Sequence, residues 1–349
     1  MFSLGQLEHP IVQAPMGGGP STPELAAAVA AAGGLGFLAA GYRSVDDVHG
    51  DIAALRALGA GSFGVNLFAP PLAGAGEEAV AAYADTLGGL GPLGEPRHDD
   101  DGFSEKLALM RSEGVPVVSF TFGCPARAVV EDLHAAGCAA WVTVTTVAEA
   151  VVARDAGADA LVVQGVEAGG HRGSFDDSAP GCVGLLALLQ AVGASVDLPL
   201  VATGGIASGR GVAAVLAAGA AAAQIGTAFM LCPEAGTTAA HRAALRGSAP
   251  TALTRAFTGR LGRGIENRFM RDHGADAPSA YPDVHHLTAP LRAEARSRGD
   301  AEELNLWAGQ AYGLARAEPA GDVVRRLAGE ARAALREAAE RWDGSKQRP

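Results

Sequence analysis

A repeated unit constrains the fold of this 349-residue chain more than any other feature of its sequence. Each unit has an alanine-rich helical stretch, then a glycine, then a short apolar run. A glycine just past a helix end closes the helix in a left-handed conformation at no steric cost. Seven glycines stand at such places: Gly33, Gly59, Gly114, Gly137, Gly157, Gly193 and Gly219. Seven stops between eight apolar runs predict a (β/α)8 barrel.

The apolar runs predict parallel strands, because they are continuous rather than alternating, as strands buried on both faces require. They cover residues 11–14, 36–39, 63–67, 116–120, 140–144, 160–164, 200–203 and 222–225. Two capping boxes, Ser21-Thr-Pro-Glu24 and Thr146-Val-Ala-Glu149, mark helix starts between them. A doubly wound open sheet is the alternative α/β fold, but eight regular units favour the closed TIM barrel.

Two regions interrupt the repeat and divide the chain. Residues 1–69 and 115–232 form the predicted barrel, and residues 70–114 form an insertion in the loop after the third strand. Residues 233–320 mix helical patterns with loops. We expect them to form a mostly helical additional module that covers the active face of the barrel. Residues 322–342 predict an amphipathic, charged helix that packs on the barrel.

Composition excludes several classes of partner. The formal net charge of −11 argues against nucleic acid and anionic membrane surfaces. The four cysteines lie far apart without a C-x-x-C pair, so neither a metal cluster nor a disulfide framework is expected. The first residues lack a basic region and a long apolar stretch, and no other run predicts a membrane span. We expect a cytoplasmic protein; a homodimer is left open.

Glycine-rich loops follow the last two predicted strands. Gly204-Gly205 follows one strand and Gly226-Thr227 follows the next. Glycine lets backbone N–H groups approach a phosphate closely, and the threonine hydroxyl can add a hydrogen bond. Two such loops on these strands form the usual phosphate site of an α/β barrel. The pair therefore predicts a phosphate-bearing ligand.

Two amide side chains end apolar strands, Asn66 on the third and Gln164 on the sixth. A buried amide is unfavourable unless it is hydrogen-bonded. Each can bind the edge of a heteroaromatic ring, or it can bind a neighbouring backbone group. Gly17-Gly18-Gly19 follows the first strand and lies either under a ligand or in a flexible turn.

His171 is the candidate acid–base residue, in the loop Glu167-Ala-Gly-Gly-His-Arg-Gly173 after the sixth strand. Histidine titrates near neutral pH and can accept and return a substrate proton. The alternative is a structural histidine. Glu167 and Arg172 either orient its ring or pair with each other. The pair His285-His286 is expected to be exposed.

These segments together resemble the nitronate monooxygenase family, formerly called 2-nitropropane dioxygenases. The resemblance runs from about Pro10 to Tyr312. It rests on Pro10-Ile-Val-Gln-Ala-Pro-Met-Gly17, Phe63-Gly-Val-Asn66, Val163-Gln-Gly-Val-Glu-Ala-Gly-Gly-His-Arg-Gly173, Ala202-Thr-Gly-Gly-Ile206 and Gln224-Ile-Gly-Thr-Ala-Phe229. The combination of these motifs in order is specific, whereas each motif alone is not.

The resemblance implies an FMN-dependent barrel that oxidises alkyl nitronates, and in some members nitroalkanes, with O2 to a carbonyl compound and nitrite. His171 would be catalytic. Pro15 and Met16 would lie beside the isoalloxazine ring. The remaining FMN contacts implied by the motifs are Asn66, Gln164, Gly169, Gly170, Gly204, Gly205, Gln224, Ile225, Gly226 and Thr227.

One position departs from the family pattern. Many members have a histidine within a Ser-Phe-His-Phe-Gly motif that deprotonates nitroalkanes, and this chain has Thr121 there. Threonine is no base near neutral pH. Either His171 replaces that base, or the enzyme uses only preformed nitronates, or the reaction differs. The resemblance extends to flavin-dependent enoyl-CoA and enoyl-ACP reductases, the first alternative. The second alternative is a flavin-free barrel that binds a phosphate-bearing ligand and acts as a lyase, an isomerase or a binding protein.

Overall fold

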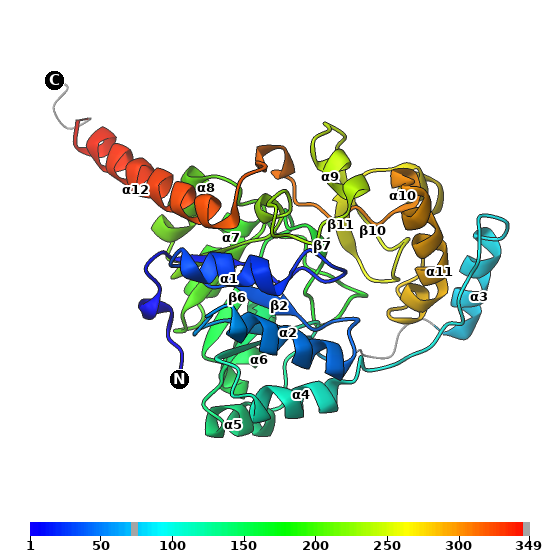
Figure 1. The fold of residues 1–349 in the computed structure, drawn as a ribbon, viewed down its shortest axis with the longest axis horizontal. Coiled ribbons are helices and arrows are strands. Elements are labelled where there is room, and N and C mark those ends of the chain that lie inside the picture. The colour runs from blue at the N-terminus through cyan, green and yellow to red at the C-terminus, as the bar shows by residue number, and fades with distance from the viewer. Residues whose placement is uncertain (71–75, 345–349) are drawn as a thin grey trace.

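Eight parallel strands form a nearly closed barrel, as predicted (Figure 1). The computed structural model describes residues 1–70 and 76–344. The strands are β1 (Ile11–Gln13), β2 (Phe37–Ala39), β3 (Gly64–Phe68), β4 (Val117–Thr121), β5 (Ala139–Val144), β6 (Ala160–Gln164), β8 (Leu200–Thr203) and β9 (Ala222–Ile225). Their order is β1-β9-β8-β6-β5-β4-β3-β2. A single parallel bridge between Val12 and Leu35 brings β1 next to the start of β2, which leaves the ring nearly closed.

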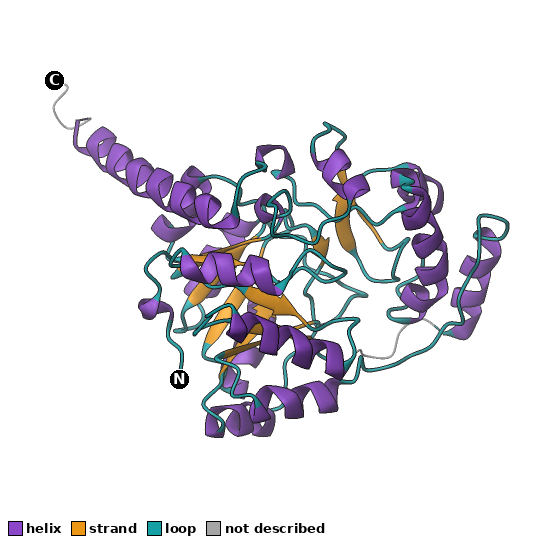
Figure 2. Cartoon of the chain, in the orientation of Figure 1, coloured by secondary structure: helices purple, strands orange, loops and turns teal. Residues whose placement is uncertain are grey.

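Helices surround the barrel (Figure 2). They are α1 (Pro23–Ala31), α2 (Val45–Ala57), α4 (Phe103–Ser112), α5 (Arg127–Ala135), α6 (Val147–Ala156), α7 (Leu185–Gly193) and α8 (Gly209–Ala217). The C-terminal helix α12 (Ala320–Gly344) packs on α8 and α1 and then extends beyond the barrel (Figure 1). No helix among the described residues is both long and apolar enough to cross a membrane.

Six of the seven predicted glycine stops have a positive φ, between 56° and 101°. The prediction is wrong at Gly193, the last residue of α7, which does not enter the left-handed region. There the chain continues with one more helical turn, because Val196 N–H donates to Val192 O at 3.0 Å. The glycine stop is therefore not needed at this helix end.

A small three-stranded antiparallel sheet was not predicted. It has the order β10-β11-β7, from β7 (Gly170–His171), β10 (Thr251–Thr254) and β11 (Gly262–Ile265). In it, His171 pairs with Gly262 and Gly170 with Arg263. The sheet joins the loop after β6 to the C-terminal module, so the module fixes the position of the candidate catalytic histidine.

The remaining helices belong mainly to that module. They are α3 (Glu77–Thr86), α9 (Ala239–Leu245), α10 (Arg268–His273), α11 (Asp283–Arg298) and the short 3-10 helices at Leu4–Gln6, Thr227–Phe229, Ala301–Glu303 and Tyr312–Leu314. A second apolar core joins α3 to α11, with Tyr83 and Leu287 in it. By contrast, α4 packs on α2 and β3 as a barrel helix. The two helices of the predicted insertion thus lie in different layers, while the predicted domain boundaries stay a prediction.

The contact between α8 and α12 generates a stability prediction. A Cβ atom on Gly209 would lie 2.1 Å from the Cβ atom of Glu330 and 2.6 Å from the nitrogen of Ala331. We therefore expect Gly209→Ala to lower the free energy of unfolding by about 1–3 kcal/mol, the usual effect of overpacking. Denaturant unfolding measures it.

Gly329→Ala in α12 is the matched control, because a Cβ atom there meets nothing within 4 Å. This substitution should stabilise the protein by about 0.5–1 kcal/mol through helix propensity. Equal effects of the two substitutions would contradict the proposed close contact.

Candidate active site

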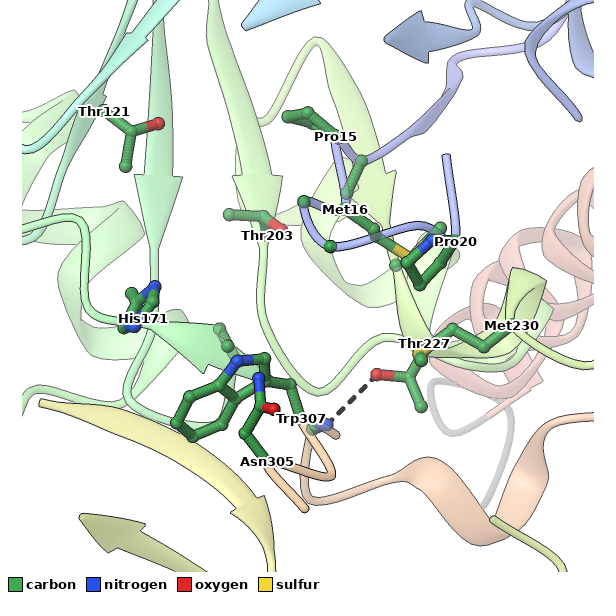
Figure 3. Close-up of a pocket in the computed structure, with 18 of the residues that line it drawn as sticks. Pro15, Met16, Pro20, Thr121, His171, Thr203, Thr227, Met230, Asn305 and Trp307 are labelled. Carbon is green, nitrogen blue, oxygen red and sulfur yellow. Dashed lines mark hydrogen bonds between the residues drawn. The ribbon is translucent and has the colours of Figure 1, made fainter. Parts of the chain in front are cut away.

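A cavity of about 400 Å³ opens at the carboxyl ends of the barrel strands. This is a size typical of ligand sites, which occupy roughly 300–1,000 Å³. Predicted site residues that line it are Pro15, Met16, Asn66, Gln164, Gly169, Gly170, His171, Gly204, Gly205, Gln224, Gly226 and Thr227. In the close-up, His171 and Trp307 lie across the cavity from Pro15 and Met16 (Figure 3).

Ile225 is the exception among the predicted cofactor contacts. Its side chain is 1% exposed and packs in the hydrophobic core rather than in the cavity. Successive side chains of a strand point to opposite faces. Gln224 and Gly226 line the cavity, so Ile225 between them points outward to the helices. Ile225 was predicted because it lies within the matched motif, and the motif does not show which face of the strand a side chain occupies.

The glycine loops offer a ring of open hydrogen-bond donors. Gly204 and Gly205 have φ values of 118° and 67°, a backbone geometry that favours glycine. Within the described ranges, the N–H groups of these two residues, Gly226 and Thr227 donate to no protein acceptor. The Thr227 hydroxyl accepts the N–H of Gly309 at 3.1 Å (Figure 3). Its own O–H remains available as a donor, which suits a phosphate.

The amide side chains differ in what they bind. Gln164 donates to His171 O at 3.1 Å and accepts from Gly173 N–H at 2.8 Å. It therefore binds neighbouring backbone groups, the second of the two predicted possibilities, and so fixes the loop of His171. Asn66 accepts hydrogen bonds from two hydroxyl groups. Gln224 lines the cavity, and its side chain forms no hydrogen bond with the described part of the chain.

His171 lies in an apolar, aromatic setting. The rings of Trp307, Phe122 and Tyr281 are centred 5.2, 5.7 and 6.0 Å from its own. Its Nε2 lies 2.8 Å from Thr258 Oγ1, and that hydroxyl donates to the carbonyl of Arg260. The imidazole Nε2–H is therefore the donor to Thr258. Burial, aided by Arg260 and Arg292, lowers the pKa of His171 to about 3.

Glu167 and Arg172 were expected either to orient the His171 ring or to pair with each other, and the described part of the structure shows neither arrangement. Arg172 is fully buried and donates to the carbonyl groups of Gly165, Gln164 and Gly181. Glu167 accepts the N–H of Leu185 at the start of α7. Both side chains thus hold the backbone of the loop after β6, and neither is bonded to the His171 ring in the described structure.

The cavity also contains residues that were not predicted. His285 lines it, contrary to the expected exposed pair, and its ring stacks on Tyr42 at 4.1 Å. His286 instead points to Asp99, at 2.9 Å. Arg292 follows on the same face of α11 and is 6% exposed. The spacing of His285, Thr288 and Arg292 by three and four residues was the signal in the sequence for one buried polar helix face.

Arg292 is a buried cation that forms no ion pair with a carboxylate of the described residues. It donates to Thr288 Oγ1 at 3.1 Å and to His285 O at 2.8 Å. Burial lowers its pKa to about 10, so the guanidinium stays charged at neutral pH. Among the described residues that line the cavity there is no Asp or Glu. An unpaired buried charge is strongly unfavourable, so the cavity is suited to an anionic ligand.

Comparisons with known proteins agree with one another. The family model described as nitronate monooxygenase matches residues 1–330. The nitronate monooxygenase of Pseudomonas aeruginosa is 41% identical over 93% of this chain and 97% of that protein. The nitronate monooxygenase of Paraburkholderia phytofirmans is 39% identical over 94% of this chain and 93% of that protein.

Solved structures extend the comparison. Nitroalkane oxidase from Streptomyces ansochromogenes has a TM-score of 0.92 and 50% identity, covering 96% of this chain and 99% of that one. FabK from Thermotoga maritima has a TM-score of 0.76 and 27% identity, and the match covers 98% of this chain and 97% of that one. The chain therefore belongs to the nitronate monooxygenase family, a family of TIM-barrel oxidoreductases.

Proposed function

We propose that this protein binds FMN and oxidises alkyl nitronate anions with O2 to a carbonyl compound and nitrite. The family is flavin-dependent in general and acts on nitronates or nitroalkanes. Bound FMN supplies the redox chemistry, while the chain binds and orients the reactants and handles protons. The observation that carries the choice of a nitronate is the Arg292 guanidinium in the cavity, which no carboxylate of residues 1–70 and 76–344 pairs with.

The cavity walls fit FMN in three ways. The open N–H groups of Gly204, Gly205, Gly226 and Thr227 suit its phosphate. The amides of Asn66 and Gln224 can bind the polar edge of its ring system. Pro15 and Met16 offer an apolar wall for a flat ring, and Ser21 fixes their loop by accepting the Met16 N–H at 2.9 Å.

Electrostatics favour a preformed nitronate over a neutral nitroalkane. A nitronate carries its negative charge on two oxygen atoms, which a planar guanidinium can bind side by side. Deprotonation of a nitroalkane would need a base of suitable strength. With a pKa of about 3, His171 is a weak base, and Thr121 supplies none. We therefore propose that His171 acts as a neutral imidazole beside the reactants, oriented by Thr258.

The test of this function starts with the visible spectrum of the purified protein. We expect a flavin spectrum, release of FMN on denaturation, and bleaching by an alkyl nitronate without O2, followed by nitrite release in air. Rapid bleaching by NAD(P)H with reoxidation by an enoyl thioester would instead identify a reductase. A colourless protein that does not bind added FMN would overturn the proposal.

Arg292 generates a kinetic prediction. Arg292→Met should raise KM for an alkyl nitronate about 10- to 100-fold, because a hydrogen-bonded charge pair is lost while the side-chain volume is kept. Steady-state nitrite release measures it. Arg298→Met is the matched control, because Arg298 lies on the same helix but binds Glu294 and Glu303 outside the cavity. A normal KM in the Arg292 variant would contradict an anion-binding role.

The low pKa of His171 generates a pH prediction. Below its ordinary pKa of 6.5 the unfolded chain protonates this ring, whereas the folded chain does so only near pH 3. Acid therefore favours unfolding in this window, by up to about 1.4 kcal/mol per pH unit. We expect the free energy of unfolding to fall from pH 6.5 to pH 4, and less steeply in His171→Asn. Identical pH slopes for the two proteins would show that His171 titrates normally.

A further inference from the structure

Two hydroxyl groups of β4 converge on one amide of β3. Ser119 and Thr121 are two residues apart, so their side chains share one face of the strand. Ser119 Oγ donates to Asn66 Oδ1 at 2.8 Å, and Thr121 Oγ1 donates to the same oxygen at 2.9 Å. All three residues line the cavity. Asn66 is 4% exposed and Ser119 is 2% exposed, so both are buried, whereas Thr121 is half-buried.

Counting donors and acceptors fixes the direction of these bonds. An amide oxygen has two lone pairs, and here both receive a hydroxyl proton. Thr121 also lies 3.4 Å from Thr143 Oγ1, and its only proton already goes to Asn66. Thr143 is then the donor in that contact. The bonds run from Thr143 to Thr121 to Asn66, and the Asn66 side-chain N–H groups form no hydrogen bond with the described part of the chain.

We propose that Thr121 and Ser119 are positioning residues that hold Asn66 with its N–H groups toward a hydrogen-bond acceptor on the ring edge of FMN. The inference rests on the proposed function, since it needs FMN as the ligand. It gives Thr121 an orienting role at a position where other family members have a histidine base. An amide held by two hydroxyl groups presents its donors in one direction, which saves the entropy of ordering it on binding.

The experiment titrates FMN into the apoprotein and follows the quenching of flavin fluorescence, so that turnover is not needed. Thr121→Val keeps the side-chain volume and removes the hydroxyl. We expect its FMN Kd to rise about tenfold, the effect of roughly one lost hydrogen bond. Thr121→Ser, which keeps the hydroxyl, should bind like the unmodified protein. Thr86→Val is the control, because the Thr86 hydroxyl binds its own helix in α3.

A double-mutant cycle tests whether Thr121 acts through Asn66. Asn66→Ala should weaken FMN binding, and adding Thr121→Val to it should cause no further loss. Equal losses from Thr121→Val with and without Asn66 would overturn the positioning role, as would unchanged affinity in Thr121→Val. Denaturant unfolding of each apoprotein checks that an affinity change is not partial unfolding.

Failure of the positioning role is distinguishable from failure of the proposed function. If the unmodified protein does not bind FMN, the function itself is wrong and the inference falls with it. If the unmodified protein and all variants bind FMN equally well, the function stands and only the positioning role is wrong.

Discussion

Buried arginine side chains hold the loop after β6, and the site depends on them. This loop carries His171, and its carbonyl groups would be unsatisfied inside the protein. Arg172 binds two of them and the carbonyl of Gln164 at the end of β6, Arg260 binds two more, and Arg263 binds that of Val166. A guanidinium has five donors in a fixed plane and so can tie several turns of backbone together. Two of the three arginines come from the C-terminal module, so barrel and module share one polar core.

Arg260 also acts on the electrostatics of the cavity, together with Arg292. The chain carries a net charge of −11, yet no acidic residue in the described ranges lines the cavity. Arg260 and Arg292 both disfavour a second positive charge on His171. His285, close to Arg292, has its pKa lowered to about 2 for the same two reasons, burial and a neighbouring cation. The net charge of the chain therefore describes the outer surface of this protein and not the candidate active site.

The sequence was sufficient to predict the barrel and many of the residues that line the cavity, because both depend on local patterns. Glycine stops and apolar runs repeat along the chain, and the loops that follow strands must meet at one end of a barrel. The Ile225 side chain lies in the hydrophobic core rather than in the cavity, which the motif could not show because a motif does not distinguish the two faces of a strand. The β7–β11 pairing could not be predicted, since Gly-Arg-Gly-Ile has little strand preference and its partner lies far away in sequence.

The strained backbone at two cavity residues could not be predicted from the sequence either. Tyr42 and Phe122 line the cavity with φ values of 66° and 79°, although neither residue favours that region. Tyr42 is held there by Asp101, which accepts its N–H at 3.0 Å. Asp101 belongs to an acidic run whose composition suggests only a solvated loop. A tertiary contact of this kind produces no periodic pattern in the sequence from which it could be predicted.

The packing of α12 on α8 has a consequence for synthesis of the protein. Glu330 accepts the N–H of Gly209 at 3.0 Å, directly after the glycine loop proposed for the phosphate. Helix α8 packs against both β9 and α12, and its Val212 and Val215 are buried. The last barrel strand ends at Ile225 and α12 begins at Ala320, so a nascent chain completes all its barrel strands before α12 can dock on α8. The hydrogen bond from the Gly209 N–H to Glu330 can form only after α12 has been synthesised.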